Sequence, residues 1–206
     1  MLWLLLASGC ATTLAEGSQA ELLLPYRGRD LPAGELALSP LGQIAFDLPA
    51  DPELSRLYYD GLGRRFPAEL RNSSRFDEVR WSEASATTLI ERSLPLKGGP
   101  LLIALPKDGE ATIPGNAHRW VLFLSKVQVT LQSERPRLLL QEVDWALWDE
   151  VERRPAAYGR VRQRGSLDFG AAVFQVGERE REIESLLTGL AVELFQGGPF
   201  FPGQRL

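Results

Sequence analysis

Residues 120–164 read WVLFLSKVQVTLQSERPRLLLQEVDWALWDEVERRPAAYGRVRQR, and this stretch decides the fold. Three runs of alternating apolar and polar residues lie within it, at 121–132, 137–148 and 156–164. Alternation with a period of two is the pattern of a strand that buries one face. The polar segments 133–136 and 149–155 are short enough to join antiparallel neighbours. The stretch therefore predicts three consecutive antiparallel strands, a meander.

Upstream of this stretch, the chain alternates between short strand patterns and helix patterns. The sequence Asp51-Pro52-Glu53 offers an N-cap residue, a proline at the first helical position and an acidic first turn. Ser82 offers a second N-cap, and Leu89, Ile90 and Leu94 follow at helical spacing. We expect strands at 44–48, 76–81 and 101–105, and helices at 51–70, broken near Pro67, and at 82–94.

The last predicted element is a helix over about 178–196, which ends at Gly197-Gly198-Pro199. This order of elements predicts an α+β fold, with a mainly antiparallel sheet, a C-terminal three-stranded meander, and helices packed on one face. A chain of 206 residues is long enough for one well-buried domain and short for two. We place that single domain at 22–206.

Composition excludes several classes of function. Hydrophobic residues make up 44% of the chain and charged residues 24%, which is typical of a globular protein. The net charge of -4 does not favour a nucleic-acid partner, since such proteins are normally basic. One cysteine makes no internal disulfide, and one histidine does not complete the usual zinc cage. We predict no cofactor and no metal.

The only cysteine, Cys10, follows an apolar run, Leu2–Leu6, and the small residues Ala7-Ser8-Gly9. This arrangement resembles a bacterial lipobox. The resemblance implies that Cys10 carries a diacylglyceryl group and becomes an acylated N-terminus, so that 1–9 is a signal segment and 10–21 a lipidated tether. The chain departs from the pattern because no basic residue precedes Arg27. The alternative is a buried strand or helix end in which Cys10 is an ordinary apolar residue.

From about Ile44 onward, the order of elements resembles that of small periplasmic lipoproteins whose domain is like the N-terminal domain of the translocation protein TolB. The segments that carry the resemblance are Phe76-Asp77-Glu78-Val79 and the turn at Trp148-Asp149. That group includes activators of peptidoglycan synthases and exopolysaccharide-export lipoproteins. The resemblance implies a non-enzymatic accessory or scaffolding subunit of an envelope assembly, facing the periplasm. Ala11 after the cysteine, in place of aspartate, resembles the pattern of lipoproteins sorted to the outer membrane.

Arg160, Arg162 and Arg164 project from one side of the last predicted strand. Such a strip is a candidate partner surface for an acidic or phosphate-bearing envelope protein. The alternative is that these charges protect a sheet edge from aggregation. The second predicted partner is the membrane, through the acyl chains on Cys10.

Two other functions stay open at this stage. Glu142, Asp144 and Asp149 are candidate acids for a hydrolase of an envelope polymer, which requires a cleft lined by two of them and at least one raised pKa. His118 is the only histidine base, and no nucleophile motif accompanies it. A small-molecule or lipid carrier requires an enclosed apolar cavity between sheet and helices. We predict no catalytic residue.

Overall fold

A computed structural model of the protein describes residues 12–15, 19–26, 34–40, 44–47, 52–74, 76–82, 88–97, 99–112, 119–134, 137–167 and 177–194. The fold is α+β. The helices are α1 (Pro52–Arg64), α2 (Phe66–Ser73), α3 (Gly177–Leu194) and the short 3-10 helix η1 (Leu24–Tyr26). The strands are β1 (Thr12–Ala15), β2 (Gln19–Leu22), β3 (Glu35–Pro40), β4 (Ile44–Asp47), β5 (Glu78–Trp81), β6 (Leu89–Leu94), β7 (Leu101–Pro106), β8 (Trp120–Glu134), β9 (Arg137–Asp149) and β10 (Arg154–Leu167).

The three long strands form where the alternating runs predict strands. β9 pairs antiparallel with β8 along one edge and with β10 along the other, from the turn at Asp149 to the opposite end at Arg137. β1 and β2 add to β10, also antiparallel. These pairings use every other residue of each strand to bury one face, as the alternation requires.

The large sheet is mixed: β1, β2, β8, β9 and β10 pair antiparallel, as the prediction of a mainly antiparallel sheet requires, but β3, β4 and β5 add parallel pairs that it did not include. β3 and β4 both run parallel to β8, and β5 runs parallel to β3. Parallel neighbours need a long crossover, and the connection from β3 to its parallel neighbour β5 runs through β4, α1 and α2. The sequence predicts this helical connection at 51–70, but it does not show which strands β3, β4 and β5 pair with.

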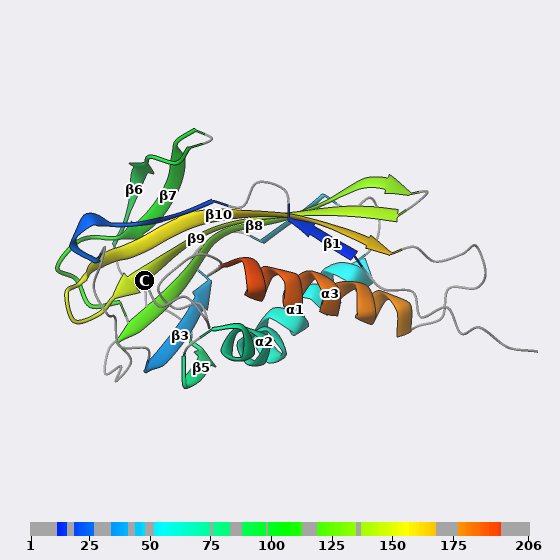
Figure 1. Ribbon diagram of the computed structural model, residues 1–206, viewed down its shortest axis with the longest axis horizontal. Helices are drawn as coiled ribbons and strands as arrows, with labels where there is room; N and C mark the ends of the chain where they lie inside the picture. The colour runs from blue at the N-terminus through cyan, green and yellow to red at the C-terminus, as the bar shows by residue number, and fades with distance from the viewer. Residues whose placement is uncertain are drawn as a thin grey trace, which may run out of the picture.

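The helices lie together on one face of the sheet, and a separate two-stranded sheet of β6 and β7 lies on the other (Figure 1). α3 packs on β10 and on both other helices. Each face of the sheet has a hydrophobic core, and β9 contributes side chains to both. Val143, Trp145 and Leu147 face the helices. Ala146 and Trp148 face β7. The helix-side core also buries Tyr58, Leu62, Phe66, Leu70, Leu186, Leu187 and Leu190.

The helix predicted at 82–94 is wrong over its second half, since Leu89–Leu94 form β6. β6 pairs antiparallel with β7 along its whole length, from Leu89 opposite Pro106 to Leu94 opposite Leu101. Helical spacing of apolar residues is ambiguous in so short a segment. The strand predicted at 101–105 supplies a pairing partner nearby, and tertiary pairing overrides the local pattern.

The tether predicted at 10–21 is corrected in part, because it contains β1 and most of β2. Thr12–Ala15 pair with Ser166–Gln163 of β10, and Gln19–Leu22 pair with Arg160–Ala157. The small and polar residues of this stretch lack the apolar alternation that predicts a strand. They pair at the edge of the sheet, where the backbone of β10 supplies the contacts.

A line of buried polar side chains runs between the sheet and the helices. The Tyr58 hydroxyl of α1 donates to Gln141 Oε1 at 2.5 Å, and burial raises the pKa of this tyrosine. Gln141 Nε2 in turn reaches Gln163 Oε1 at 3.3 Å and the Leu186 carbonyl of α3 at 3.4 Å. Because buried polar groups are costly unless paired, these bonds fix how the helices sit on the sheet.

Gly159 of β10 is a position where only glycine fits. A Cβ there would overlap the carbonyl oxygen of Gln19 on β2 and lie 2.9 Å from the Trp145 ring. We expect Gly159→Ala to lower the free energy of unfolding by about 1–3 kcal/mol, because backbone and ring must move to make room. Urea denaturation measures the change.

Gly63 of α1 provides the matched control, since a Cβ at this position meets nothing within 4 Å. Gly63→Ala should leave stability unchanged or raise it by about 0.5–1 kcal/mol, the difference in helix propensity. Equal effects of the two substitutions would contradict the packing assigned to Gly159.

Candidate functional site

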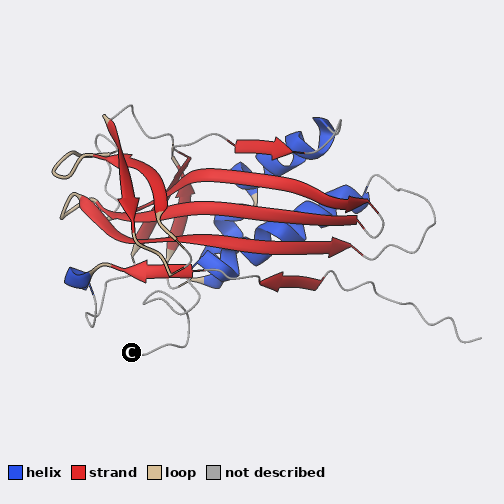
Figure 2. Ribbon diagram, turned by 90° about the horizontal axis from the view of Figure 1, so that it is seen from above, coloured by secondary structure: helices blue, strands red, loops and turns tan. Residues whose placement is uncertain are grey.

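The sheet face opposite the helices is covered unequally. β7 packs over Val121 and Phe123 of β8, Ala146 and Trp148 of β9, and Tyr158 of β10, all near the β9–β10 turn. Seen from above, β6 and β7 cross one end of the long strands, and the rest of this face lies open among the described elements (Figure 2). We call that part the open face.

Charged side chains from the three long strands pair with one another on the open face. We call this set the charged ladder: Lys126, Glu142, Asp144, Arg160 and Arg162. The register makes it possible, because Arg160 lies opposite Asp144 and Arg162 opposite Glu142. Directly opposite side chains of unlike charge are close enough to pair.

The pair between Arg160 and Asp144 is the more buried one. Arg160 Nε lies 2.6 Å from Asp144 Oδ1, and Nη2 lies 3.0 Å from Oδ2, a two-point contact. The side chain of Asp144 is 3% exposed and that of Arg160 is 25% exposed. A guanidinium that binds both carboxylate oxygens holds their geometry more firmly than a single contact does.

Glu142 lies between three cations. Its carboxylate accepts from Arg162 Nε at 2.6 Å and lies 3.5 Å from Lys126 Nζ and 3.7 Å from Arg160 Nε. Partial burial alone would raise the pKa of Glu142, but the hydrogen bond and charge of Arg162, with the charges of Arg160 and Lys126, outweigh it and lower the pKa. The carboxylate therefore stays ionised at neutral pH.

The predicted strip of Arg160, Arg162 and Arg164 is not a row of unpaired cations. Two of its members pair with carboxylates of β9, and Arg164 lies further along the same side of β10. Sequence reasoning missed Lys126, whose side chain joins the ladder from β8. The alternation of 121–132 places it on this face once the irregularity between Leu124 and Lys126 is known.

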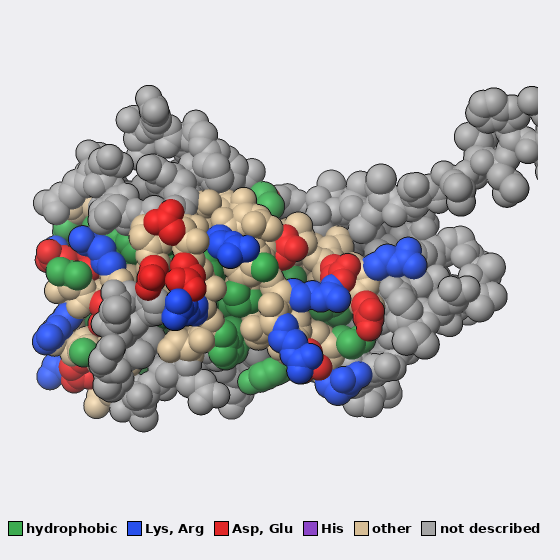
Figure 3. All heavy atoms as spheres, turned by 90° about the horizontal axis from the view of Figure 1, so that it is seen from below, with side chains coloured by type: hydrophobic (Ala, Val, Ile, Leu, Met, Phe, Trp, Pro, Cys, Tyr) green, Lys and Arg blue, Asp and Glu red, His purple; other side chains and the backbone are tan. Residues whose placement is uncertain are grey.

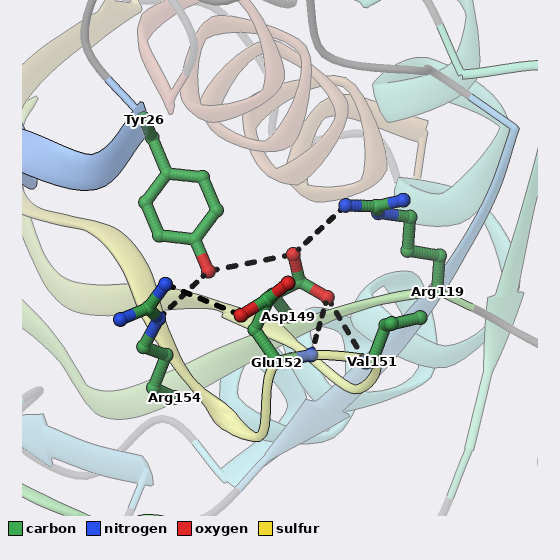
Figure 4. Close-up of polar contacts among 6 residues, drawn as sticks. All are labelled: Tyr26, Arg119, Asp149, Val151, Glu152 and Arg154. Carbon is green, nitrogen blue, oxygen red and sulfur yellow. Dashed lines mark hydrogen bonds and ion pairs between the residues drawn. The ribbon is translucent and has the colours of Figure 1, made fainter.

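A second polar cluster closes the β9–β10 turn and centres on Asp149, which is fully buried (Figure 4). Its Oδ1 accepts from the backbone N–H groups of Val151 at 2.9 Å and Glu152 at 3.2 Å. Its Oδ2 lies 3.1 Å from Arg119 Nη2 and accepts from the Tyr26 hydroxyl at 3.4 Å. We call these contacts the turn cluster.

Tyr26 connects η1 to this turn. Arg154 Nε donates to the tyrosine oxygen at 3.4 Å, and its guanidinium lies over the Tyr26 ring, 5.6 Å from the centroid. Burial and the charge of Asp149 raise the pKa of Tyr26, and they outweigh the hydrogen bond and charge of Arg154, which lower it. Glu150, next to Asp149, accepts from the backbone and hydroxyl of Thr112. The cluster thus joins parts of the chain far apart in sequence.

The three candidate acids of a hydrolase do not meet in one place. Asp149 lies five residues along β9 from Asp144, about 17 Å at the rise of a strand. That exceeds the separation at which two carboxylates flank a glycosidic bond. Glu142 and Asp144 share a face, but arginines bind both. The lowered pKa of Glu142 is the opposite of what the hydrolase hypothesis expects.

Cys10 and His118 lie outside the described residues. Among the residues that the structure describes, there is no group of three or more histidine, cysteine, aspartate or glutamate side chains placed to hold a metal ion. Within the same part of the chain, no helix is long and apolar enough to cross a membrane.

The helix side of the molecule carries exposed charges of both signs (Figure 3). Arg56 pairs with Asp60 one turn along α1 at 3.5 Å, and Arg65 pairs with Glu184 of α3. Such exposed pairs contribute little to stability. Together with the exposed side chain of Tyr59, they give the described part of this side a mixed surface.

Comparison with known proteins finds no family model and no curated protein that matches this chain. Solved structures that it resembles include the PelC dodecamer from Paraburkholderia phytofirmans, at 12% identity and a TM-score of 0.41, over 90% of this chain and 95% of that one. A form of the same dodecamer with one leucine replaced by methionine aligns at 14% identity and a TM-score of 0.43, over 95% and 100% of the two chains.

The turn cluster predicts a large effect of removing Asp149. Asp149→Ala leaves Arg119, Tyr26 and two backbone N–H groups without their acceptor, so we expect the free energy of unfolding to fall by about 2–3 kcal/mol. Chemical denaturation measures it. Asp108→Ala is the control, because Asp108 also pairs with an arginine but is 61% exposed, and we expect a loss of at most about 1 kcal/mol. Similar losses would contradict the structural role of Asp149.

The lowered pKa of Glu142 predicts a pH-dependent stability. A carboxyl that binds protons more weakly when folded stabilises the protein above its unfolded pKa, near 4.5, and loses this contribution as pH falls through the folded pKa. Wild type should therefore be more stable than Glu142→Gln at pH 7, with the difference shrinking toward pH 3. Urea denaturation across this range tests it. Glu91→Gln changes an exposed carboxyl of β6, and its free energy of unfolding should differ less from that of wild type at pH 7. A difference between wild type and Glu142→Gln that stays constant from pH 7 to pH 3 would refute the lowered pKa of Glu142.

Proposed function

We propose that this chain is a membrane-anchored periplasmic lipoprotein that acts as a non-enzymatic accessory or scaffolding subunit of an envelope assembly. The observation that carries the proposal is the sequence Ala7-Ser8-Gly9-Cys10 behind an apolar run. In this proposal Cys10 is acylated and residues 1–9 are removed. Ala11 in the following position supports sorting to the outer membrane.

Acyl chains account for the anchoring in this proposal. Each buried methylene contributes about 0.8 kcal/mol, and two or more chains give stable attachment where one chain does not. Holding the domain at the membrane raises its effective concentration near partners there. The function is then largely positional, and a binding surface is the property that the domain must supply.

The contacts of Glu142 and Asp149, and the lowered pKa of Glu142, support a binding role over a catalytic one. A general acid at neutral pH needs a raised pKa, whereas three cations lower the pKa of Glu142. Asp149 has no exposed surface and already accepts four contacts. These acids hold the sheet and its turn together. The described residues offer no observation that favours the hydrolase or the carrier alternative.

The open face is the surface that we assign to a partner. Its central strands carry four basic residues, the ladder members Lys126, Arg160 and Arg162 together with Arg164, against the two carboxylates Glu142 and Asp144. Internal pairing fixes the ladder in place before a partner arrives, so little side-chain freedom is lost on binding. The arginine and lysine side chains of this set favour an acidic or phosphate-bearing surface on an envelope protein.

The decisive experiment is the mass of the N-terminal peptide after expression of the full-length gene, with its native upstream region, in a related bacterium. We expect loss of residues 1–9 and a diacylglyceryl group on Cys10, and recovery of the protein with membranes. Cys10→Ala should abolish the lipid and release the protein from membranes. A peptide that retains residues 1–9 and an unmodified thiol would refute the proposal.

A further inference from the structure

The first strand begins two residues after the cysteine of the lipobox. β1 starts at Thr12, so only Ala11 lies between it and Cys10. Thr12 lies opposite Ser166 of β10, Ser166 opposite Leu138 of β9, and Leu138 opposite Ser133 of β8. These residues form one row across the end of the long strands. We call this the anchor end of the sheet.

Chain geometry keeps the anchor end close to Cys10. Two residues reach at most about 7 Å when fully extended. The headgroup layer on each side of a bilayer is about 5–7 Å thick. A lipid on Cys10 would therefore hold Thr12 at the membrane surface itself, because no flexible segment separates the strand from the anchor.

The opposite end of the sheet lies far from this row. Leu138 and Asp149 are eleven residues apart on β9, which corresponds to about 36 Å along the strand. The β9–β10 turn and the β7 strand both lie toward that end, which we call the far end. Figures 1 and 2 show β1 at one end of the long strands and the β6–β7 pair toward the other.

Among the described residues, both broad faces carry paired charges, which do not favour flat adsorption to a bilayer. A surface that lies flat in the interfacial layer needs a continuous apolar face. The helix side carries the exposed pairs Arg56–Asp60 and Arg65–Glu184, and the open face carries the charged ladder. Leu102 is 60% exposed but lies on β7, toward the far end.

From these observations we propose that the anchor end faces the bilayer and that the long strands stand away from it, so that the far end is presented about 36 Å from the membrane surface. The partner of the anchor end is the lipid headgroup layer. This inference rests on the proposed acylation of Cys10. It adds an orientation: the β9–β10 turn and the β6–β7 pair face outward, and the open face stands at an angle to the membrane.

Fluorescent labels at chosen cysteines test the orientation. Because Cys10 is the only cysteine and its sulfur carries the lipid, an introduced cysteine is the only free thiol in the acylated protein. Suitable exposed positions are Gln132, beside the Ser133 row, Leu102 on β7, and Val151 in the β9–β10 turn. The lipidated variants are placed in vesicles of phosphatidylethanolamine and phosphatidylglycerol that contain a lipid with a nitroxide on its headgroup.

We expect the label on Gln132→Cys to be quenched about twofold or more by the nitroxide lipid, while the labels on Leu102→Cys and Val151→Cys are unaffected, since they lie well beyond the headgroup layer. Circular dichroism verifies that each variant is folded. A matched variant inserts twelve Gly and Ser residues between Ala11 and Thr12, a flexible segment of about 20 Å. Quenching at Gln132 should then fall sharply although the lipid is still present.

The outcomes separate this inference from the proposed function. If the acylated protein floats with the vesicles but Leu102 or Val151 is quenched as strongly as Gln132, the molecule lies flat or inverted and the orientation is overturned. Absence of quenching at all three positions in floating protein overturns it as well. If the protein carries no lipid and does not float, the proposed function itself fails.

Discussion

The pairing of β9 with β8 on one side and with β10 on the other is the constraint on which the rest of the structure depends. Because β9 pairs along almost its whole length on each side, the side-chain period of two fixes which residues face the helices and which face outward. A shift of one residue would move Trp145 and Val143 out of the core and bring Asp144 into it. The two hydrophobic cores and the charged ladder are therefore consequences of one register.

The same register explains why the acidic and basic residues of these strands pair with one another across the sheet. Arginines of β10 fall opposite carboxylates of β9, so each charge meets its partner as soon as the strands pair. The buried Asp144 is tolerable because Arg160 binds both of its oxygens. At the end of β9, Asp149 turns the chain by accepting backbone N–H groups, and Arg119 offsets its charge. These ionic groups hold the strands and the turn in position, and they give the open face a set of paired charges.

The sequence predicts the elements whose patterns are long and local. β8, β9, β10 and α3 lie within a few residues of the predicted runs, and the break near Pro67 agrees with the boundary between α1 and α2. β6 could not be predicted, because its six residues fit a helix as well as a strand until β7 pairs with them. The turn cluster escaped prediction for another reason, since Tyr26 and Asp149 are 123 positions apart in sequence and no local pattern joins them. The sequence indicates the carboxylates as candidates, but their arginine partners, which decide their chemistry, depend on register.

We assign two roles to the N-terminal strands β1 and β2, although their sequence lacks a strand pattern. β1 and β2 both lie along β10, where they cover backbone groups that would otherwise form an open sheet edge. Under the proposed acylation, β1 also transmits any pull from the membrane to the domain. The residue pairs between β1 and β10 follow one another along the strand axis. A pull along that axis therefore shears all of these pairs at the same time and does not break them one by one. A strand of four residues is short, but this geometry lets it serve as both edge cover and mechanical link. The polar composition that resembles a tether is compatible with both roles, because the contacts involved are made by the backbone.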